Sequence, residues 1–416
     1  MSGREFDLVL FGATGFVGAL TAEYLARAAP AGTRIAVAGR SPEKLDVLLR
    51  RLGHGAAGWR TIVVDAGSPA ALAAMAGRTT VVVTTVGPYA RYGLPLVEAC
   101  ARAGTHYADL TGEPLFVRDC VDRFDRIAAD SGARIVNSCG FDSVPSDLNA
   151  YLLHRRLAED GAGRMTDTTL VAALKGGMSG GTVDSGITQM AAVAADPALA
   201  RVVADPYALS PDRDREPDLG AQPDHALRRA GTVDPGLSGW VTTFIMASHN
   251  TKIVRRSAAL LDWAYGRDFR YREVMYAGRS PVAPAVAAGV AGALAALQAW
   301  GPVIARGPGL RMLRRLAPAP GTGPDEKARA SGHFTMTTFT RSTTGARYRA
   351  VFAAQGDPGY RSTAVMLGES GLALALDGKR LPGAAGVLTP ATAMADALGE
   401  RLRAAGFTLT TAPAGA

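Results

Sequence analysis

The sequence predicts an α/β protein that begins with a doubly wound parallel sheet. Residues 6–11 form a short apolar run that suits a buried parallel strand. A glycine-rich turn at 12–18 follows directly, and apolar residues then recur at helical spacing from Val17. Strand-like and helix-like segments go on alternating to residue 137, and with 416 residues the chain is long enough for a second domain.

The glycine-rich turn is the candidate phosphate-binding loop. Its glycines are spaced G-x-x-G-x-x-G between a strand and a helix. Glycine lets the backbone approach a pyrophosphate, and the first N–H groups of the helix face the anion. This context predicts a Rossmann-type dinucleotide site, whereas the alternative is a glycine-rich turn that holds no ligand. The expected cofactor contacts in this turn are Gly12, Thr14, Gly15, Phe16 and Val17.

The end of the second strand, predicted over 34–40, selects the cofactor. An NAD enzyme usually places Asp or Glu here to bind the ribose hydroxyls, but this chain has Gly39-Arg40-Ser41. A guanidinium and a hydroxyl bind a 2′-phosphate, which a carboxylate would repel. Arg40 and Ser41 therefore predict NADP(H), and the alternative is that Arg40 is an ordinary exposed charge at a strand end.

Four more strands complete the predicted first sheet, and two more helices are expected beside it. The strands are expected at 61–65, 79–86, 106–110 and 134–137, and the helices at about 93–103 and 114–130. Ligands of such sheets lie beyond the carboxyl ends of the strands. We therefore expect Asp65 near the adenine, with a role at the start of the next helix as the alternative. Val86, Gly87 and Pro88 are expected near the nicotinamide ribose.

Three residues at the same edge are the candidate catalytic residues. Tyr89 follows the fourth strand, and Asp142 and Ser143 follow the sixth. Their positions place them where a substrate would meet the cofactor. The alternatives for all three are turn structure and helix capping.

The second half of the chain predicts a further α+β domain. Strands are expected at 166–174, 240–247, 269–276, 333–340 and 347–354, and helices at 251–264, 360–376 and 390–405. The strands at 333–340 and 347–354 are predicted as a hairpin, 201–236 as a long loop, and 410–416 as a loose end. The predicted domains are a dinucleotide-binding domain (1–150), a substrate or interface domain (151–350) and C-terminal helices that return to the first domain (351–416).

Residues 177–181 read G-x-S-x-G, the pattern of a hydrolase nucleophile elbow around Ser179. A serine hydrolase is therefore one alternative. The glycines on both sides, and the dinucleotide loop earlier in the chain, favour a glycine-rich wall of the substrate or cofactor site instead.

The segment 280–305 contains no charged residue, and four arginines follow it at 306–315. Val282, Val286 and Val290 begin a helical stripe on an alanine and glycine background. The length would suffice for a membrane span, but the small residues favour a helix that packs on the second domain or on a second copy of the chain. The arginines add a peripheral contact with an anionic lipid surface as a further interpretation.

Composition limits the remaining classes of function. Three cysteines without a C-x-x-C spacing argue against a disulfide framework, and we expect a cytoplasmic protein, with a peripheral contact at the plasma membrane. The six histidines show no paired ligand spacing, so no metal site is expected. The net charge is +8, but no basic stripe interleaved with aromatic residues exists, and nucleic-acid binding is not expected.

The motifs taken together resemble those of the saccharopine dehydrogenase-like oxidoreductases, and most closely the trans-acting enoyl reductases. The resemblance covers nearly the whole chain and includes residues 12–18, 39–41, 86–89, 107–113, 140–147, 254–257, 356–360 and 386–390. It implies NADP(H), a second domain with a mixed or antiparallel sheet, a small-molecule or carrier-bound acyl substrate, and a polyketide synthase as partner. A saccharopine-type amino-acid dehydrogenase and a non-catalytic NADP-binding protein at a lipid surface are the alternatives.

Overall fold

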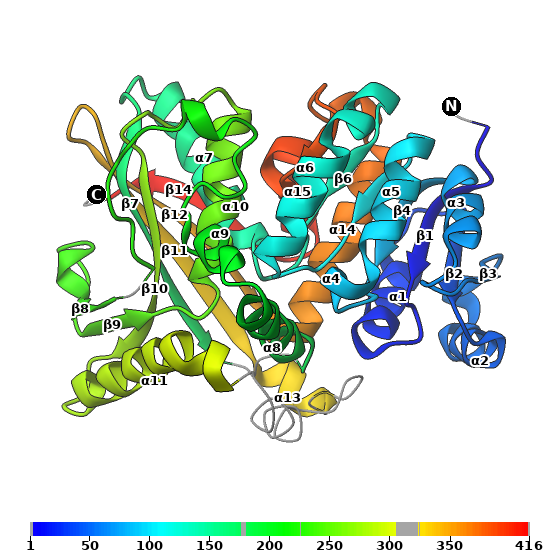
Figure 1. The fold of residues 1–416 in the computed structure, drawn as a ribbon, viewed down its shortest axis with the longest axis horizontal. Coiled ribbons are helices and arrows are strands. Elements are labelled where there is room, and N and C mark those ends of the chain that lie inside the picture. The colour runs from blue at the N-terminus through cyan, green and yellow to red at the C-terminus, as the bar shows by residue number, and fades with distance from the viewer. Residues whose placement is uncertain (1–2, 176–179, 225, 305–322, 324, 415–416) are drawn as a thin grey trace.

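The protein contains two large sheets that lie side by side, each covered by helices (Figure 1). The computed structural model describes residues 3–175, 180–224, 226–304, 323 and 325–414. Within these residues, sheet A has the strand order β13-β6-β5-β4-β1-β2-β3, and sheet B has the order β14-β12-β11-β7-β10-β9-β8. The described pairs of sheet A are all parallel, whereas sheet B combines antiparallel pairs with a parallel β7–β10 pair. The predicted fold class is confirmed.

The strands of sheet A are β1 (Phe6–Phe11), β2 (Ile35–Gly39), β3 (Arg60–Val63), β4 (Thr79–Thr84), β5 (His106–Ala108), β6 (Arg134–Val136) and β13 (Gly386–Leu388). Those of sheet B are β7 (Met165–Lys175), β8 (Leu227–Arg229), β9 (Trp240–Thr243), β10 (Arg270–Gly278), β11 (His333–Ser342), β12 (Arg347–Gln355) and β14 (Thr408–Pro413). All the predicted strands are present, with ends shifted by a few residues.

The helices are α1 (Phe16–Ala28), α2 (Pro42–Leu52), α3 (Pro69–Gly77), α4 (Tyr89–Tyr92), α5 (Leu94–Ala103), α6 (Pro114–Ser131), α7 (Val144–Glu159), α8 (Gly180–Ala195), α9 (Ala198–Ala204), α10 (Ala247–Leu260), α11 (Ala283–Ile304), α13 (Glu326–Ser331), α14 (Thr363–Leu376) and α15 (Pro390–Ala404). The helix predicted at 251–264 begins four residues earlier, and a π-helical turn, η4 (Pro358–Ser362), precedes α14.

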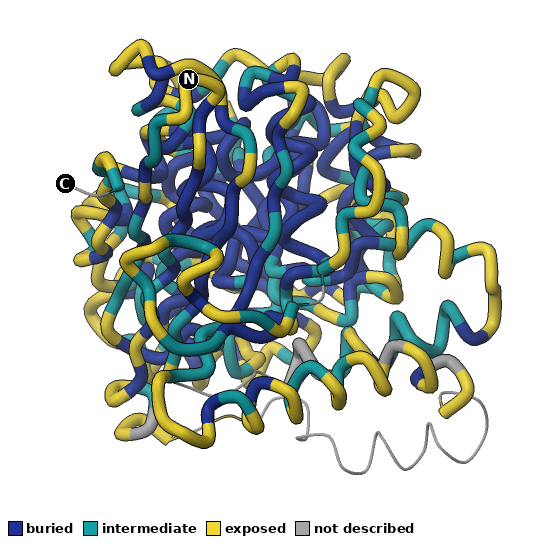
Figure 2. Tube along the Cα trace, turned by 90° about the vertical axis from the view of Figure 1, so that its left-hand side faces the viewer, coloured by how far each residue is buried: buried dark blue, intermediate teal, exposed yellow. Residues whose placement is uncertain are grey.

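Sheet A is buried on both faces. Successive side chains of a strand point to opposite faces, so Leu8 and Leu10 of β1 pack with α1 and α14, while Val9 and Phe11 pack with α3 and α5. The first of these cores continues through α7 and α15 to the strands of sheet B. Figure 2 shows the buried residues gathered in this central region.

The C-terminal part of the chain contributes to both sheets. β13 adds a parallel strand beside β6, and α14 packs against α1 and β4, so these elements return to the first sheet (Figure 1). β14 then pairs with β12 in sheet B. The expectation of a loose end at 410–416 was therefore wrong for residues 410–413, which belong to an edge strand, and residues 415–416 lie outside the described part of the chain. The domain boundaries at 150 and 350 stay a prediction, and α7 crosses the first of them.

The uncharged segment forms α11, which packs on sheet B through its small residues. Ala283 and Ala287 are buried, and the carbonyl oxygen of Ala287 accepts a hydrogen bond from Thr242 Oγ1 at 2.8 Å. Val282 and Val286, which begin the predicted stripe, are exposed. The small residues opposite the stripe therefore pack on the strands, because residues without bulk allow a close approach.

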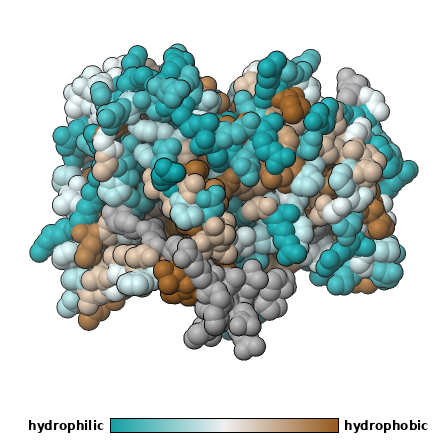
Figure 3. Space-filling view, viewed as in Figure 1, coloured by the Kyte–Doolittle hydropathy of each residue, from teal (hydrophilic) through white to brown (hydrophobic). Residues whose placement is uncertain are grey.

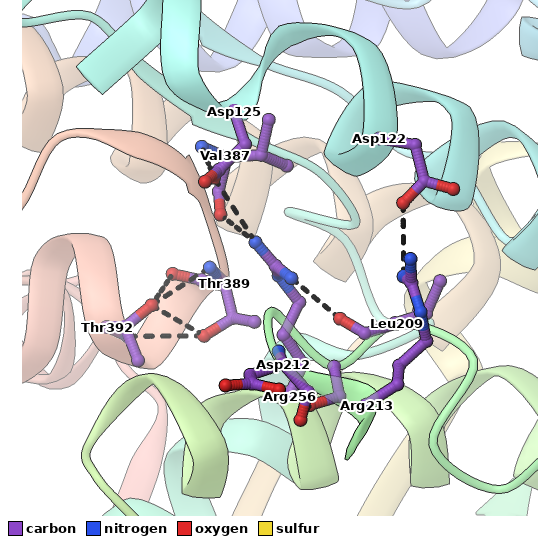
Figure 4. Close-up of polar contacts among 10 residues, drawn as sticks. Asp122, Asp125, Leu209, Asp212, Arg213, Arg256, Val387, Thr389 and Thr392 are labelled. Atoms are coloured by element: carbon purple, nitrogen blue, oxygen red, sulfur yellow. Dashed lines mark hydrogen bonds and ion pairs between the residues drawn. The ribbon is translucent and has the colours of Figure 1, made fainter. Parts of the chain in front are cut away.

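Arg256 of α10 joins the two halves of the molecule (Figure 4). Its buried guanidinium donates to the carbonyl oxygen of Leu209 at 2.6 Å and to that of Val387 in β13. It also lies 3.5 Å from the carboxylate of Asp125, which accepts from the Val387 N–H at 2.8 Å. Burial lowers the pKa of Arg256 to about 10, so the side chain stays charged at neutral pH.

Replacing Arg256 with methionine should lower the free energy of unfolding by about 3–5 kcal/mol, because two buried carbonyls and a carboxylate would lose their donor. Arg213 is the matched control, since its guanidinium pairs with Asp122 at 3.0 Å but is 35% exposed. Arg213→Met should change stability by at most about 1 kcal/mol. Urea denaturation measures both, and equal effects would show that Arg256 is not a structural tie.

Candidate functional site

The glycine-rich turn has the geometry of a phosphate cradle. Gly12 has φ +84°, and a Cβ there would lie 2.8 Å from side-chain atoms of Thr85 and Val86. A Cβ at Gly18 would lie 2.2 Å from the Gly12 carbonyl oxygen, so only glycine lets the helix approach this closely. Gly15 is exposed and caps α1 without a side-chain hydrogen bond. The first N–H groups of α1 are thus presented to an anion, and the turn fits a dinucleotide pyrophosphate.

Residues from the far end of the chain cover this turn. The ring of Phe16 lies edge-on to Tyr360, with 5.0 Å between ring centroids. The guanidinium of Arg329, on α13, lies 5.4 Å from the Phe16 centroid. No sequence signal connected residues 329 and 360 with the glycine turn, because only tertiary folding brings them together.

The residues expected around the adenosine end lie beside one another at the carboxyl ends of β2 and β3. Arg40 is exposed at the end of β2. Ser41 caps α2: its Oγ accepts from the Lys44 N–H at 3.3 Å and donates to Glu43 at 2.8 Å. Asp65 is exposed and closes a turn by accepting from the Gly67 N–H at 2.7 Å. Ser41 thus caps α2, whereas Arg40 does not. Contact of Arg40, Ser41 and Asp65 with a cofactor stays a prediction.

The turn after β4 is held by a carboxylate that the sequence analysis did not single out. Val86, Gly87 and Pro88 lead into it, and the Gly87–Pro88 peptide bond is cis. The carboxylate of Glu113 accepts from the Tyr89 and Ala90 N–H groups at 2.9 and 2.8 Å. It also accepts from Ser185 of α8 at 2.7 Å. Glu113 thereby ties the expected nicotinamide end of the crevice to the second domain.

Tyr89 is buried and its hydroxyl is engaged on both sides. The hydroxyl donates to the Thr84 carbonyl oxygen and accepts from the Leu110 N–H, both at 3.2 Å. Burial raises the pKa of Tyr89 well above its usual range. These contacts favour the structural alternative for Tyr89.

A second buried carboxylate, Asp109, organises the loop after β5. Its oxygens accept from the Tyr107 hydroxyl, the Asn137 amide and the backbone N–H groups of Thr111 and Ser138, at 2.8 to 3.0 Å. Burial raises its pKa to about 6, against the effect of these donors. Asp109 is therefore a positioning residue, which fixes the loops beyond β5 and β6.

Ser138 connects the hydrogen-bond network of Asp109 with the second domain. It has φ +63°, and its Oγ lies 2.8 Å from Nε2 of His249 on α10. Burial lowers the pKa of His249 to about 3, and its Nδ1 has no hydrogen-bond partner among the described residues. His249 is therefore a neutral imidazole at the interface of the two domains.

Asp142 and Ser143 take different positions although they are adjacent. Ser143 is buried and donates to Asn250 of α10 at 3.1 Å. Asp142 is half-buried, and a Cβ at Gly112 would lie 3.8 Å from its Oδ2 and 3.3 Å from the Met246 side chain. Burial alone raises the pKa of Asp142 to about 7. Ser179, the alternative nucleophile, lies outside the described residues.

The fold and the glycine cradle define an oxidoreductase with an NADP-binding domain. The saccharopine dehydrogenase NADP binding domain family matches residues 8–136. Among solved structures, apo saccharopine dehydrogenase (L-Glu forming) from Saccharomyces cerevisiae has a TM-score of 0.55 at 13% sequence identity, and the match covers 98% of this chain and 99% of that one. This likeness shows the same fold over nearly the whole chain.

The chain belongs to the trans-acting enoyl reductases. It is 53% identical over 411 residues to a trans-acting enoyl reductase of Mycobacterium tuberculosis (strain ATCC 25618 / H37Rv), and 52% identical over 410 residues to that of Mycobacterium ulcerans (strain Agy99). A second protein of the same M. tuberculosis strain, which carries this group name provisionally, is 55% identical over 414 residues. Each match covers 98% of both chains.

Gly15 and Gly18 should respond differently to substitution. Gly15→Leu should fold and lose NADPH binding, because Gly15 is exposed and its Cβ would lie 3.3 Å from the Gly12 carbonyl oxygen, a contact that a small shift relieves, while a bulky side chain would block the phosphate. Gly18→Ala should lower thermal stability, because its Cβ would collide with a backbone oxygen. Thermal unfolding and NADPH fluorescence titration separate the two effects. If a folded Gly15→Leu variant bound NADPH normally, the cofactor site would have to lie outside the glycine turn.

Proposed function

We propose that the protein reduces a carbon–carbon double bond conjugated to an acyl thioester, with Asp142 as proton donor. The observation that carries this proposal is the position of Asp142, a half-buried carboxyl beyond the end of β6 on the same sheet edge as the glycine cradle, and burial raises its pKa to about 7. A catalytic acid is most effective when its pKa is near the working pH.

The glycine turn at Gly12, Gly15 and Gly18 would hold NADPH, which would supply the hydride for the carbon β to the thioester carbonyl. Negative charge then develops on the thioester oxygen and the α-carbon, which need hydrogen-bond donors and a proton. Protonated Asp142 can deliver that proton. His249 cannot do so as an imidazolium, because its pKa of about 3 keeps it neutral.

A cavity of about 340 Å³ beside the crevice supports an acyl substrate. It lies between the turn after β4, α6, α8 and α9. The apolar part of its wall includes Leu115, Phe116, Leu199 and Val202, and the charged part consists of Glu113, Arg118, Asp119 and Asp122. Apolar walls near a few polar groups are typical of sites for small apolar ligands. We infer that an acyl chain held on a carrier, with a polyketide synthase as the donor, enters along this cavity.

Two alternative functions predict different reactions. A saccharopine-type amino-acid dehydrogenase would oxidise or form a secondary amine and would ignore enoyl thioesters. A non-catalytic protein would bind NADPH without consuming it in the presence of any thioester. The family of the chain favours enoyl reduction over both.

Asp142→Asn should lower kcat/KM for NADPH-dependent reduction of a 2-enoyl thioester by about 100-fold, because an amide cannot donate the proton. In the unmodified protein the acid is active when protonated. The rate should therefore be constant below pH 7 and fall about tenfold per pH unit above it.

Asp130→Asn is the matched control, since Asp130 is exposed at the end of α6 and should leave both rate and pH profile unchanged. NADPH titration of Asp142→Asn should show unchanged affinity, which separates proton transfer from binding. An Asp142→Asn variant that keeps the full rate and the same fall above pH 7 would remove Asp142 from the mechanism.

We further propose that α11 docks on an anionic lipid surface. Trp300, Val282, Val286 and Val303 are 52–63% exposed along it, and Figure 3 shows hydrophobic residues gathered over this helix at the lower left. Among the described helices, α11 is long and apolar enough to cross a membrane, by length and composition only. In its apolar stretch Ala283–Gly301, 12% is buried inside the protein. Its packing on β9 favours a peripheral contact, which the arginines of the 306–315 sequence would strengthen.

Replacing Val286 and Trp300 together with glutamate should abolish binding to vesicles that contain phosphatidylglycerol, because each apolar side chain contributes about 1.5–3 kcal/mol when buried. Val47→Glu, at an equally exposed valine of α2, is the control. Cosedimentation at low and high salt measures the binding, which high salt should reverse. Vesicle binding that survives the double change would contradict the proposal, and a loss of dimers instead would assign α11 to a contact between two copies.

A further inference from the structure

A cavity of about 400 Å³ lies on sheet B, away from the crevice of sheet A. Its wall is built from β10, β8 and the segment 221–224, and it includes Gln222, Asp224, Arg228, Arg270, Arg272 and Glu273. The residues that line it all come from the second half of the chain. It is thus separate from the glycine cradle and from Asp142.

The charges around this cavity are predominantly positive. Three arginines line it, and α10 places Arg255 and Lys252 behind the wall, where both are buried. Arg255 donates to the Tyr271 carbonyl oxygen at 2.8 Å and interacts electrostatically with Asp224 and Glu273. Two carboxyl groups, Asp224 and Glu273, line the cavity near these five cationic side chains, while Asp205 interacts with Lys252 and Asp167 lies near Arg272.

The two carboxyl groups are already engaged elsewhere. Glu273 accepts from the Asn250 amide and from the Tyr271 hydroxyl, both at 2.9 Å, and its burial raises its pKa to about 7. Asp224 accepts from the Thr251 hydroxyl at 3.2 Å. The carboxylate oxygens of Glu273 and Asp224 therefore have too few free acceptor positions for the guanidinium N–H donors around the cavity.

Several of these donors have no acceptor among the described residues. They are Nε of Arg228 and both Nε and Nη1 of Arg255, all of which are buried. A buried donor without a partner costs about 1–3 kcal/mol, so native structures rarely keep several together without a ligand or water. Arg272 is also weakly paired, since its Nη2 lies 3.9 Å from the exposed carboxylate of Asp167.

We propose that this cavity binds a phosphate ester. The planar fork of a guanidinium matches the oxygens of a phosphate, and several forks around one cavity suit an anion that carries more charge and more acceptor oxygens than a carboxylate. The phosphate could be that of the pantetheine arm of a thioester carrier or that of a glycerophosphate headgroup. This site does not depend on which bond the enzyme reduces.

The test uses the full chain saturated with NADP⁺, so that the cofactor site is already filled. Calorimetric titration at constant ionic strength compares 4′-phosphopantetheine with pantetheine, and sn-glycerol 3-phosphate with glycerol. At least one phosphorylated probe should bind ten times more tightly than its unphosphorylated counterpart. The tighter of the two phosphorylated probes identifies the source of the phosphate.

Arg228→Gln and Arg272→Gln should each weaken the phosphorylated probe by at least tenfold while NADP⁺ affinity stays unchanged. Arg349→Gln, at an exposed arginine of β12, should have no effect. Circular dichroism checks folding, and Arg228→Gln alone suffices if Arg272→Gln does not fold. Equal binding of each phosphorylated and unphosphorylated pair, or unchanged binding in Arg228→Gln, would overturn the proposal.

Discussion

The close approach of α1 to the turn after β1 is the constraint on which the rest of the site depends. Because Gly18 has no Cβ, its backbone can pack against the Gly12 carbonyl, and α1 can begin within the turn. The helix N-terminus and the ends of β2 and β4 then meet at one crevice. Any side chain at Gly18 would push α1 away from the sheet and with it the N–H groups that would face the pyrophosphate.

Buried polar groups beside this crevice connect the two domains. Glu113 reaches Ser185 of α8, and Ser138 contacts His249 of α10, so the loops beyond β4, β5 and β6 are fixed from both sides. Arg256 adds a tie between α10 and β13. A hydrophobic core that runs from sheet A through α7 to sheet B accompanies these contacts. The crevice is therefore pre-organised, and this lowers the entropic cost of bringing cofactor and substrate together.

Most strands of the two sheets and the glycine turn could be predicted because periodicity and glycine spacing are local signals. β13 and β14 could not, since three residues at 386–388 and a polar strand at 408–413 gain their stability only from the strands beside them. The small residues of α11 favoured a packed helix, but its position against β9 could not be predicted, because only tertiary folding brings Ala283 and Ala287 to that strand. Asp109 and Glu113 belong to the 107–113 motif of the resemblance, but their roles could not be predicted, because contacts with backbone N–H groups leave no sequence pattern.

The central claim is that a hydride passes from NADPH to the β-carbon of an enoyl thioester in the crevice beside Asp142. Reaction of the protein with C4-deuterated NADPH and a 2-enoyl thioester, followed by mass spectrometry of the product, tests it most directly. We expect the saturated thioester with one deuterium at the β-carbon, and, with ordinary NADPH in D₂O, one deuterium at the α-carbon. NADPH that stays unconsumed, or a thioester that is hydrolysed with its double bond intact, would contradict this account.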